Sequence, residues 1–442
     1  MFTSDKGQLD VAHEALLREW PMLAEWITRT KDDRGQLRLV EREAEEWDKR
    51  GRGFVPPPER LQPIYTVLQR LNVTKSELRP VLRDYLYPQA MLLAELDRPE
   101  TDERRRLRIG DDLDLLDDPR EGVGVKEGMP DMVWLPVEVS SDAVTIETHE
   151  SDIGPLVIQP FFIARYQVTY AQYQAFVDAE DGFANPEWWQ DFPEDYRPQA
   201  LRDPRGPNDN NPRDSVSWYQ SVAFARWMDF RYRETGLLAS WVANLPISLR
   251  ELGLGDEGKW QIRLPTEWEW QWAAQGGAEQ GEYPWGGWQK GMANTSESGL
   301  GRAIAVGMYP HGAANCGALD MVGNLMEWCQ NDRDDPTIVD GYRNRNSKVL
   351  RGGSFFNDQN YGRAASRHNN SSDRRHDYFG LRLVLAALYA HTKLCRQLVR
   401  RALTSQSLAL QATCRLVQRH FVRREVACPL MRLLVCSWQT PQ

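Results

Sequence analysis

The side chains between Lys348 and Val384 could form aromatic contacts and hydrogen bonds, but they include no thiol. This stretch, KVLRGGSFFNDQNYGRAASRHNNSSDRRHDYFGLRLV, combines Phe, Tyr, His, Arg, Asp, Asn and Ser without a cysteine. Rigid aromatic rings together with adaptable polar groups are typical of protein-binding surfaces. The residue types therefore favour recognition over thiolate chemistry.

The cysteines of the chain form no metal or redox motif. No two of them stand in a C-x-x-C pair, so the spacing predicts neither a zinc site nor a redox couple. We expect free thiols, as in a protein of a reducing compartment. The six residues are Cys316, Cys329, Cys395, Cys414, Cys428 and Cys436.

Glycine patterns provide no nucleotide site. GLGDEGKW (Gly253–Trp260) is similar to a phosphate-binding loop, but Trp260 stands where a Ser or Thr should hold magnesium. The acidic pair in its centre would repel phosphate, and the segment leads into an extended stretch instead of a helix. Gly122, Gly124 and Gly128 lack the flanking strand and helix of a dinucleotide site, so we expect a loop there.

Four regions with different composition must position these groups. Residues 1–100 show apolar residues at helical spacing and predict a small helical domain, with a break at Pro21. Residues 101–132 predict a charged linker. Residues 133–384 alternate short strands, turns, a few helices and many of the 17 tryptophans, which predicts an α+β domain. Residues 385–442 form a basic tail, which we expect to be disordered or loosely docked.

Length and charge restrict the function classes. A chain of 442 residues predicts two or three domains. Nine Lys or Arg and one Glu follow Val384, so this tail carries +8, and residues 1–384 carry −17 of the total of −9. The main body is therefore not expected to bind nucleic acid, whereas the tail could contact an acidic partner or a membrane surface. We expect no transmembrane segment and no secretory signal, which predicts a cytoplasmic location.

Seven motifs in a fixed order identify the central region. PFFIARYQVTYAQYQAFV, PRDSVSWYQSVAFARWM, RLPTEWEWQWAAQGG, YPWGG, MVGNLMEW, VLRGGSFF and FGLRLV together resemble the formylglycine-generating enzyme (sulfatase-modifying factor) family. The resemblance implies a variant of the C-type lectin fold, with a small mixed sheet and long loops. In such a fold we expect the tryptophans of these motifs to be core residues, namely Trp218, Trp227, Trp268, Trp272, Trp285 and Trp328.

The catalytic groups of that family are absent from the sequence. The authentic oxidases bind copper through two cysteines, which should fall near Asn357 and Gly362, and soft thiolates are what cuprous copper requires. A related branch oxidises sulfur with iron held by His-x-x-x-His-x-Glu, a motif this chain lacks. The resemblance therefore implies a domain of this fold without the family's chemistry, with an enzyme of the oxidase class as the alternative.

The resemblance also implies a calcium site. Some oxidases of this fold hold calcium through residues that match Asn294, Asn324 and Glu327, and oxygen ligands suit calcium. The alternative is that Asn324 and Glu327 only cap and brace a turn.

The final motif resembles one subgroup more closely, the target proteins of diversity-generating retroelements. Their unmutated sequence RAANRNNNNPDNRNNNIGFR aligns with Arg363–Arg382, and Ser372 replaces the usual Pro. Randomised adenines in Asn codons cannot produce Lys, Glu, Gln, Met or Trp, and none of these five residue types occupies an aligned Asn position. Gln359, which precedes the aligned stretch, would have to be a constant residue. We expect a surface that binds a protein or another macromolecule, with an ordinary polar loop as the alternative. Its predicted residues are Phe355, Phe356, Asn357, Asp358, Asn360, Tyr361, Ser366, His368, Asn370, Ser371, Arg374, His376, Asp377 and Tyr378.

The N-terminal region carries a second resemblance. VAHEALLREWP and EEWDKRGR are similar to the end of the ATPase module of STAND-type signalling proteins, over about residues 1–60. This implies an adaptor or remnant of a signalling architecture, and a regulatory module of such a system is a further alternative function.

Overall fold

The computed structural model describes most of the chain before residue 388. The described residues are 2–5, 8–11, 21–139, 144–146, 153–156, 158–196, 200–202, 205–206, 208–246, 249–250, 255–339, 342 and 346–387. The predicted basic tail lies outside them, apart from residues 385–387. Among the described residues, no helix combines the length and apolar character that a bilayer span requires.

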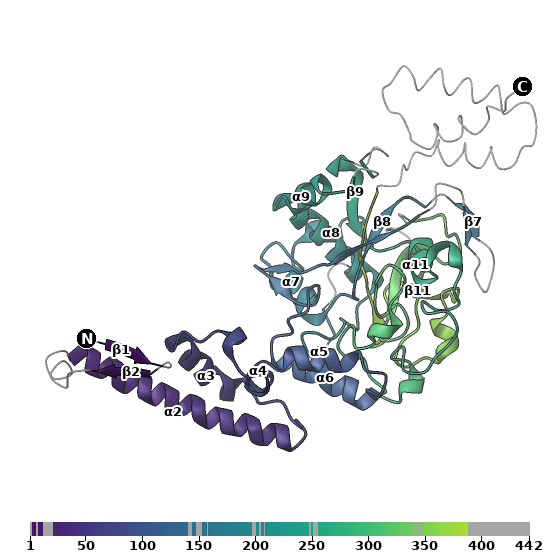
Figure 1. Ribbon diagram of the computed structural model, residues 1–442. Helices are drawn as coiled ribbons and strands as arrows, with labels where there is room; N and C mark the ends of the chain where they lie inside the picture. Colours follow the sequence, from purple (N-terminus) through teal and green to yellow (C-terminus); the bar gives the residue numbers. More distant parts are fainter. Residues whose placement is uncertain are drawn as a thin grey trace, which may run out of the picture.

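The N-terminal region is helical, as expected, but its elements differ from the prediction. A hairpin that ends at Val11 comes first, and Pro21, where a break was expected, begins one long helix instead (Figure 1). Proline suits this first helical position because it has no N–H to leave unpaired. The elements are β1 (Phe2–Asp5), β2 (Gln8–Val11), α2 (Pro21–Lys49), α3 (Pro58–Arg70), α4 (Pro80–Leu86) and α5 (Gln89–Leu96).

The predicted charged linker is wrong for residues 103–115, which form helix α6 (Glu103–Leu115). Ile109 and Leu113 of this helix are completely buried and pack with residues of α2 to α5. The same cluster includes Ile304 and Met308 of the C-terminal domain, and α5 and α6 lie against that domain in Figure 1. Helix α6 was not predicted because most of its residues are charged and its apolar residues form only a narrow stripe at helical spacing.

Two four-stranded sheets organise the C-terminal domain. The first sheet has the order β5-β8-β14-β9 and the second the order β12-β11-β10-β13. All pairs are antiparallel except β10 with β13. The strands are β5 (Trp134–Val137), β8 (Phe161–Ala164), β9 (Trp260–Arg263), β10 (Met326–Asp332), β11 (Ser347–Arg351), β12 (His368–Ser371), β13 (Phe379–Gly380) and β14 (Val384–Ala387). Short hairpins pair β3 (Val125–Lys126) with β4 (Met129–Pro130) and β6 (Val144–Ile146) with β7 (Ile153–Leu156).

Local sequence signals start the helices of this domain. A Ser or Thr precedes each of α7 (Tyr170–Asp178), α8 (Trp218–Glu234) and α11 (Glu267–Ala274), and a Gln or Glu follows three residues later. The two side chains bond each other's backbone N–H groups, which satisfies donors that a helix start leaves unpaired. A further helix, α9 (Leu237–Ala243), follows the left-handed Gly236.

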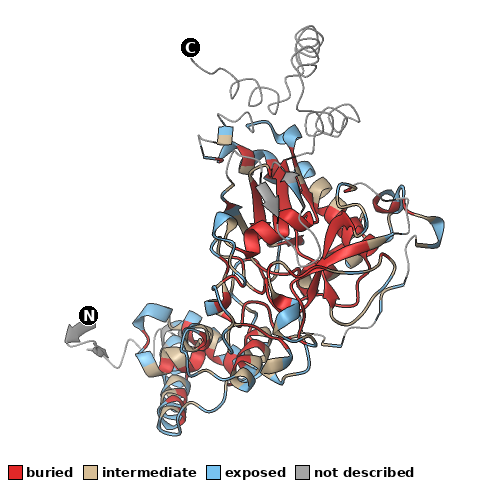
Figure 2. Cartoon of the chain, turned by 90° about the vertical axis from the view of Figure 1, so that its right-hand side faces the viewer, coloured by how far each residue is buried: buried red, intermediate tan, exposed pale blue. Residues whose placement is uncertain are grey.

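The first sheet is buried on both faces (Figure 2). Side chains alternate across a strand, and Phe162 accordingly packs in one apolar cluster with the aromatic residues of α7 and α8, whereas Phe161 and Ile163 pack in another with α11. Five of the six tryptophans predicted as core are buried, and Trp285 is half-buried. The domain was expected to end at residue 384, but β14 runs to Ala387.

Candidate recognition site

The residues between Lys348 and Gly380 form both edges of the second sheet. The chain leaves central strand β11, passes a loop and the 3-10 helix η9 (Gln359–Gly362), and returns as edge strand β12, where His368 pairs with Leu350. A second loop then leads to β13 at the opposite edge, where Phe379 pairs with Met326. The two loops of one continuous sequence therefore meet at the end of the sheet.

Three stacked rings join these two loops. Phe356 of the first loop stacks on Tyr378 of the second, with ring centroids 5.8 Å apart and planes at 18°. His376 stacks on the same tyrosine at 5.0 Å and 16°. The buried ring of Phe379 meets both His376 and Tyr378 edge-on. This anchoring holds the rings in place while 68% of Phe356 stays exposed.

Further polar and aromatic side chains lie on the same two loops and on β12. Tyr361, which is 41% exposed, stacks on His368 of β12 at 4.6 Å. Asp358, Asn360 and Arg374 are exposed, and Asn370 and Ser371 are half-buried. We call the following set the recognition face: Phe356, Asp358, Asn360, Tyr361, His368, Asn370, Ser371, Arg374, His376 and Tyr378.

Four of the predicted residues, Phe355, Asn357, Ser366 and Asp377, are not included in this set. Ser366, expected at the surface, is only 3% exposed, and its hydroxyl donates to the carbonyl oxygen of Asn360 at 2.6 Å. Asn357 holds its loop through Ser354 and through its own carbonyl oxygen, which accepts from the N–H of Ser296. Phe355 is buried and lines a pocket with Asp377. Ser366 and Phe355 were expected at the surface, but the fold turns both side chains inwards.

A buried ion pair and a second buried arginine support the first loop from the interior of the domain. Arg367 donates two hydrogen bonds to Glu267 at 2.6 and 3.0 Å, both side chains being almost inaccessible. Arg351 donates to the carbonyl oxygen of Ser366 and lies over the ring of Trp270. Burial lowers the pKa of Arg351. These contacts keep the first loop in register with α11 and β11.

The second loop is also held from its other side by residues 200–218. The guanidinium of Arg202 donates to the carbonyl oxygen of Arg375 at 2.7 Å, and Arg375 donates to that of Ala200 at 2.6 Å. Arg205 forms an ion pair with Asp377 at 2.6 Å.

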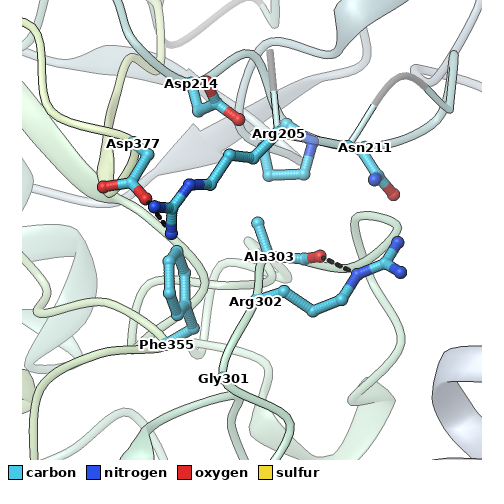
Figure 3. Close-up of a pocket in the computed structure, with 10 residues that line it drawn as sticks. Arg205, Asn211, Asp214, Gly301, Arg302, Ala303, Phe355 and Asp377 are labelled. Atoms are coloured by element: carbon cyan, nitrogen blue, oxygen red, sulfur yellow. Dashed lines mark hydrogen bonds and ion pairs between the residues drawn. The ribbon is translucent and has the colours of Figure 1, made fainter.

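A pocket lies beside the aromatic column, between residues 205–214 and 301–303 (Figure 3). Its lining includes Arg205, Asn211, Asp214 and Arg302 together with Phe355. Burial raises the pKa of the Asp214 carboxyl. None of the four polar residues was predicted as a site. The polar run NDNNPRDS contains Asn211 and Asp214, whereas no sequence motif marks Arg205 or Arg302.

The residues predicted to hold calcium do not fit that ion. Arg382 donates three hydrogen bonds of 2.8–3.1 Å to Glu327, so a guanidinium already neutralises this carboxylate. The side-chain oxygen of Asn324 accepts from the N–H of Ile304 and from Asn294, and that of Asn294 accepts from Ser298. Protein donors thus occupy the oxygens a cation would need. Asn324, at φ +59°, and Glu327 brace the turn, which was the alternative expectation.

The two described cysteines are free thiols with little tendency to ionise. Cys329 is completely buried on β10, and Cys316 is half-buried. Burial raises the pKa of both thiols. Over the described part of the chain, no three His, Cys, Asp or Glu side chains are grouped as metal ligands.

Comparison with known families supports both resemblances. The sulfatase-modifying factor enzyme 1-like domain matches residues 125–387. The chain belongs to this family. The novel STAND NTPase 1 model matches residues 1–53, in agreement with the STAND resemblance of the N-terminal region.

Curated relatives of the sulfatase-modifying factor domain have different named activities. A formylglycine-generating enzyme of Thermomonospora curvata is 27% identical over 53% of this chain and 85% of its own length. A hercynine oxygenase of Mycolicibacterium thermoresistibile is 28% identical over 51% of each chain, so this chain spans about half of that relative. The inactive C-alpha-formylglycine-generating enzyme 2 of Mus musculus is 27% identical over 62% of this chain and 91% of its own.

Among solved structures, variable protein 1 of Treponema denticola is similar to this chain at 20% identity and a TM-score of 0.40. The similarity covers 59% of this chain and 98% of the variable protein.

Proposed function

We propose that this chain is a non-catalytic binding protein whose sulfatase-modifying factor domain presents the recognition face to a protein partner. The stacked column of His376, Tyr378 and Phe356 carries the proposal. It offers exposed aromatic area whose geometry is already fixed, so little conformational entropy is lost on binding. The polar groups around it can satisfy a partner's hydrogen bonds.

The chemistry of the thiols supports the same proposal. A copper-dependent oxidase needs thiolate ligands, whereas burial raises the pKa of Cys316 and Cys329, the two cysteines in the described part of the chain. We further propose that the face is diversified in the manner of retroelement target proteins, that the protein acts in the cytoplasm, and that the N-terminal helices connect it to a STAND-type signalling system.

A display library tests the binding role. Codons for Phe356, Asp358, Asn360, Arg374 and Tyr378 are randomised in the full chain, and variants are selected against a panel of unrelated purified proteins. A matched library randomises exposed Glu180, Glu257 and Glu279 with two further exposed positions away from the face. We expect folded binders from the first library only. Equal yields from both libraries would contradict a dedicated recognition face.

Two measurements separate the alternatives. Titration with cuprous ion, with oxygen uptake measured in the presence of a cysteine-containing peptide, should show neither tight binding nor turnover. Turnover would establish the oxidase alternative. Sequencing of the gene across a cultured population should find variation concentrated in codons 355–378, with Arg351 and Arg382 constant. Even variation along the gene would refute diversification but leave the binding role intact.

A further inference from the structure

The pocket beside the recognition face contains polar groups that nothing in the described protein satisfies. Asn211 is only 2% exposed, and neither its amide nitrogen nor its amide oxygen has a hydrogen-bond partner. One carboxylate oxygen of Asp214, a residue 4% exposed, is also unpartnered. Buried polar groups without partners are rare and unfavourable, so a group from outside the chain is expected to complete them.

The position of the pocket links it to the recognition face. In the sequence, Phe355 directly precedes Phe356, and Asp377 lies between His376 and Tyr378; both Phe355 and Asp377 line the pocket. The ion pair of Arg205 with Asp377 borders it, and Figure 3 shows the amide of Asn211 directed towards the guanidinium end of Arg302. The pocket therefore shares Phe355 and Asp377 with the two loops that carry the aromatic column.

The charges and size of the pocket restrict what can enter. Two arginines and two aspartates line it, namely Arg205, Arg302, Asp214 and Asp377, so neither a bare anion nor a bare cation is favoured. Its volume of about 30 Å³ admits one small polar group or about two water molecules. A neutral group with both donor and acceptor atoms fits these conditions.

We propose that this pocket binds a primary carboxamide, such as the side chain of an Asn or Gln on the partner. A primary carboxamide has one carbonyl acceptor and two N–H donors. The Asn211 nitrogen can donate to its oxygen, and the Asn211 oxygen can accept from its nitrogen. The inference rests on the proposed function, because it places a polar subsite at the edge of the recognition face.

The test uses the full chain labelled with ¹⁵N in its asparagine side chains and titrated with acetamide. N,N-dimethylacetamide, which has no N–H donor, acetate and methylammonium are the matched probes. We expect a saturable shift of the Asn211 side-chain signal with acetamide only. An unshifted signal, an equal shift with every probe, or ordered water as the only occupant in a crystal soaked with acetamide would overturn the proposal.

Two variants make the test independent of folding failures. Asn211→Ser assigns the signal by removing it, whereas Asn360→Ser on the exposed face should leave the acetamide shift of Asn211 unchanged. Gly206→Ala fills the site and displaces the Asn211 side chain, because a Cβ at Gly206 would lie 2.8 Å from the Asn211 amide nitrogen. It should also abolish the shift, and retained binding in this variant would contradict the assigned position.

The acetamide test and the library selection can fail separately. Library binders without acetamide binding would refute only the carboxamide subsite. Acetamide binding without library binders would refute the recognition role and leave a site for small amides.

Discussion

The guanidinium of Arg106 on helix α6 donates a hydrogen bond of 2.6 Å to the carbonyl oxygen of Met308 in the C-terminal domain. It also donates to the carbonyl oxygens of Leu96 and Thr101, and it is 3% exposed. A single buried cation thus joins the helical region to the sulfatase-modifying factor domain.

The segments of the C-terminal domain that contact helix α6, around residues 208–210 and 304–305, continue into the lining of the pocket. Asn208 donates to Asp111 at 2.7 Å, and Asn210 donates to the carbonyl oxygen of Gly110 at 2.9 Å. Gly110 lies so close to Ala305 that an added Cβ would be 2.7 Å from that residue's own. The pocket is lined by Asn211 and by residues 301–303, which directly follow and precede these contact residues in the sequence. The same two loops therefore contact helix α6 and line the pocket.

Arg106→Met should loosen helix α6 from the domain. The variant leaves three carbonyl oxygens without their charged donor, and we expect a loss of about 2–3 kcal/mol. Hydrogen exchange at Ile109 and Leu113 and urea unfolding measure it. Arg108→Met, at an exposed position of the same helix, is the control and should change little. Equal exchange in the two variants would show that Arg106 does not join the two regions.

Tyrosine should be tolerated at Arg374 but not at Ser366. Both changes lie within the predicted diversified positions, yet Arg374 is exposed and Ser366 is buried beneath the loop. We expect Arg374→Tyr to change the unfolding free energy by less than about 0.5 kcal/mol. Ser366→Tyr overfills its site and should cost about 1–3 kcal/mol. Thermal and urea unfolding compare them, and a neutral Ser366→Tyr would place that side chain at the surface after all.

Asp320 should make the protein less stable as the pH rises from about 4 to about 6. Burial raises the pKa of this carboxyl from 3.8 to about 6, although the N–H of Gly307 donates to it. Between these values the folded protein holds a proton that the unfolded chain has lost, so the stabilisation present below pH 3.8 disappears as the pH passes about 6.

The Asp320→Asn variant isolates this effect, because an amide oxygen can still accept from Gly307 and does not titrate. Urea unfolding of both proteins at several pH values should show the variant gaining relative stability up to about pH 6 and no further. A difference independent of pH would mean that Asp320 ionises normally in the folded protein.

Gly323 in the motif MVGNLMEW should not tolerate a side chain. Its φ of +78° is left-handed, and a Cβ would lie 2.3 Å from the carbonyl oxygen of Asn294. Gly299 has a similar φ of +69° but open space around it. We expect Gly299→Ala to cost about 1–2 kcal/mol from backbone strain alone, and Gly323→Ala to cost about 2–5 kcal/mol because a clash is added. Similar unfolding midpoints for both would exclude the clash.

The sequence by itself determined the family, the helices of the domain and the aromatic core. These depend on local signals, since a Ser or Thr with a Gln or Glu three residues later starts each of α7, α8 and α11, and the ordered motifs surround them. Even helix α6 was encoded locally, because Ile109 and Leu113 are four residues apart, but its many charges hid the stripe.

Only the tertiary structure decided which residues between Lys348 and Val384 reach the surface and which residues lie beside them. Phe356 and Tyr378 meet because β11 ends and β13 begins at the same end of one sheet, where Arg351 and Gly380 both pair with Glu327, and no local pattern reports such pairing. Ser366 turns inwards, where its hydroxyl donates to the carbonyl oxygen of Asn360. Arg382 reaches Glu327 across 55 residues and excludes a cation from that carboxylate, and the unpartnered amide of Asn211 becomes visible only when its surroundings are assembled.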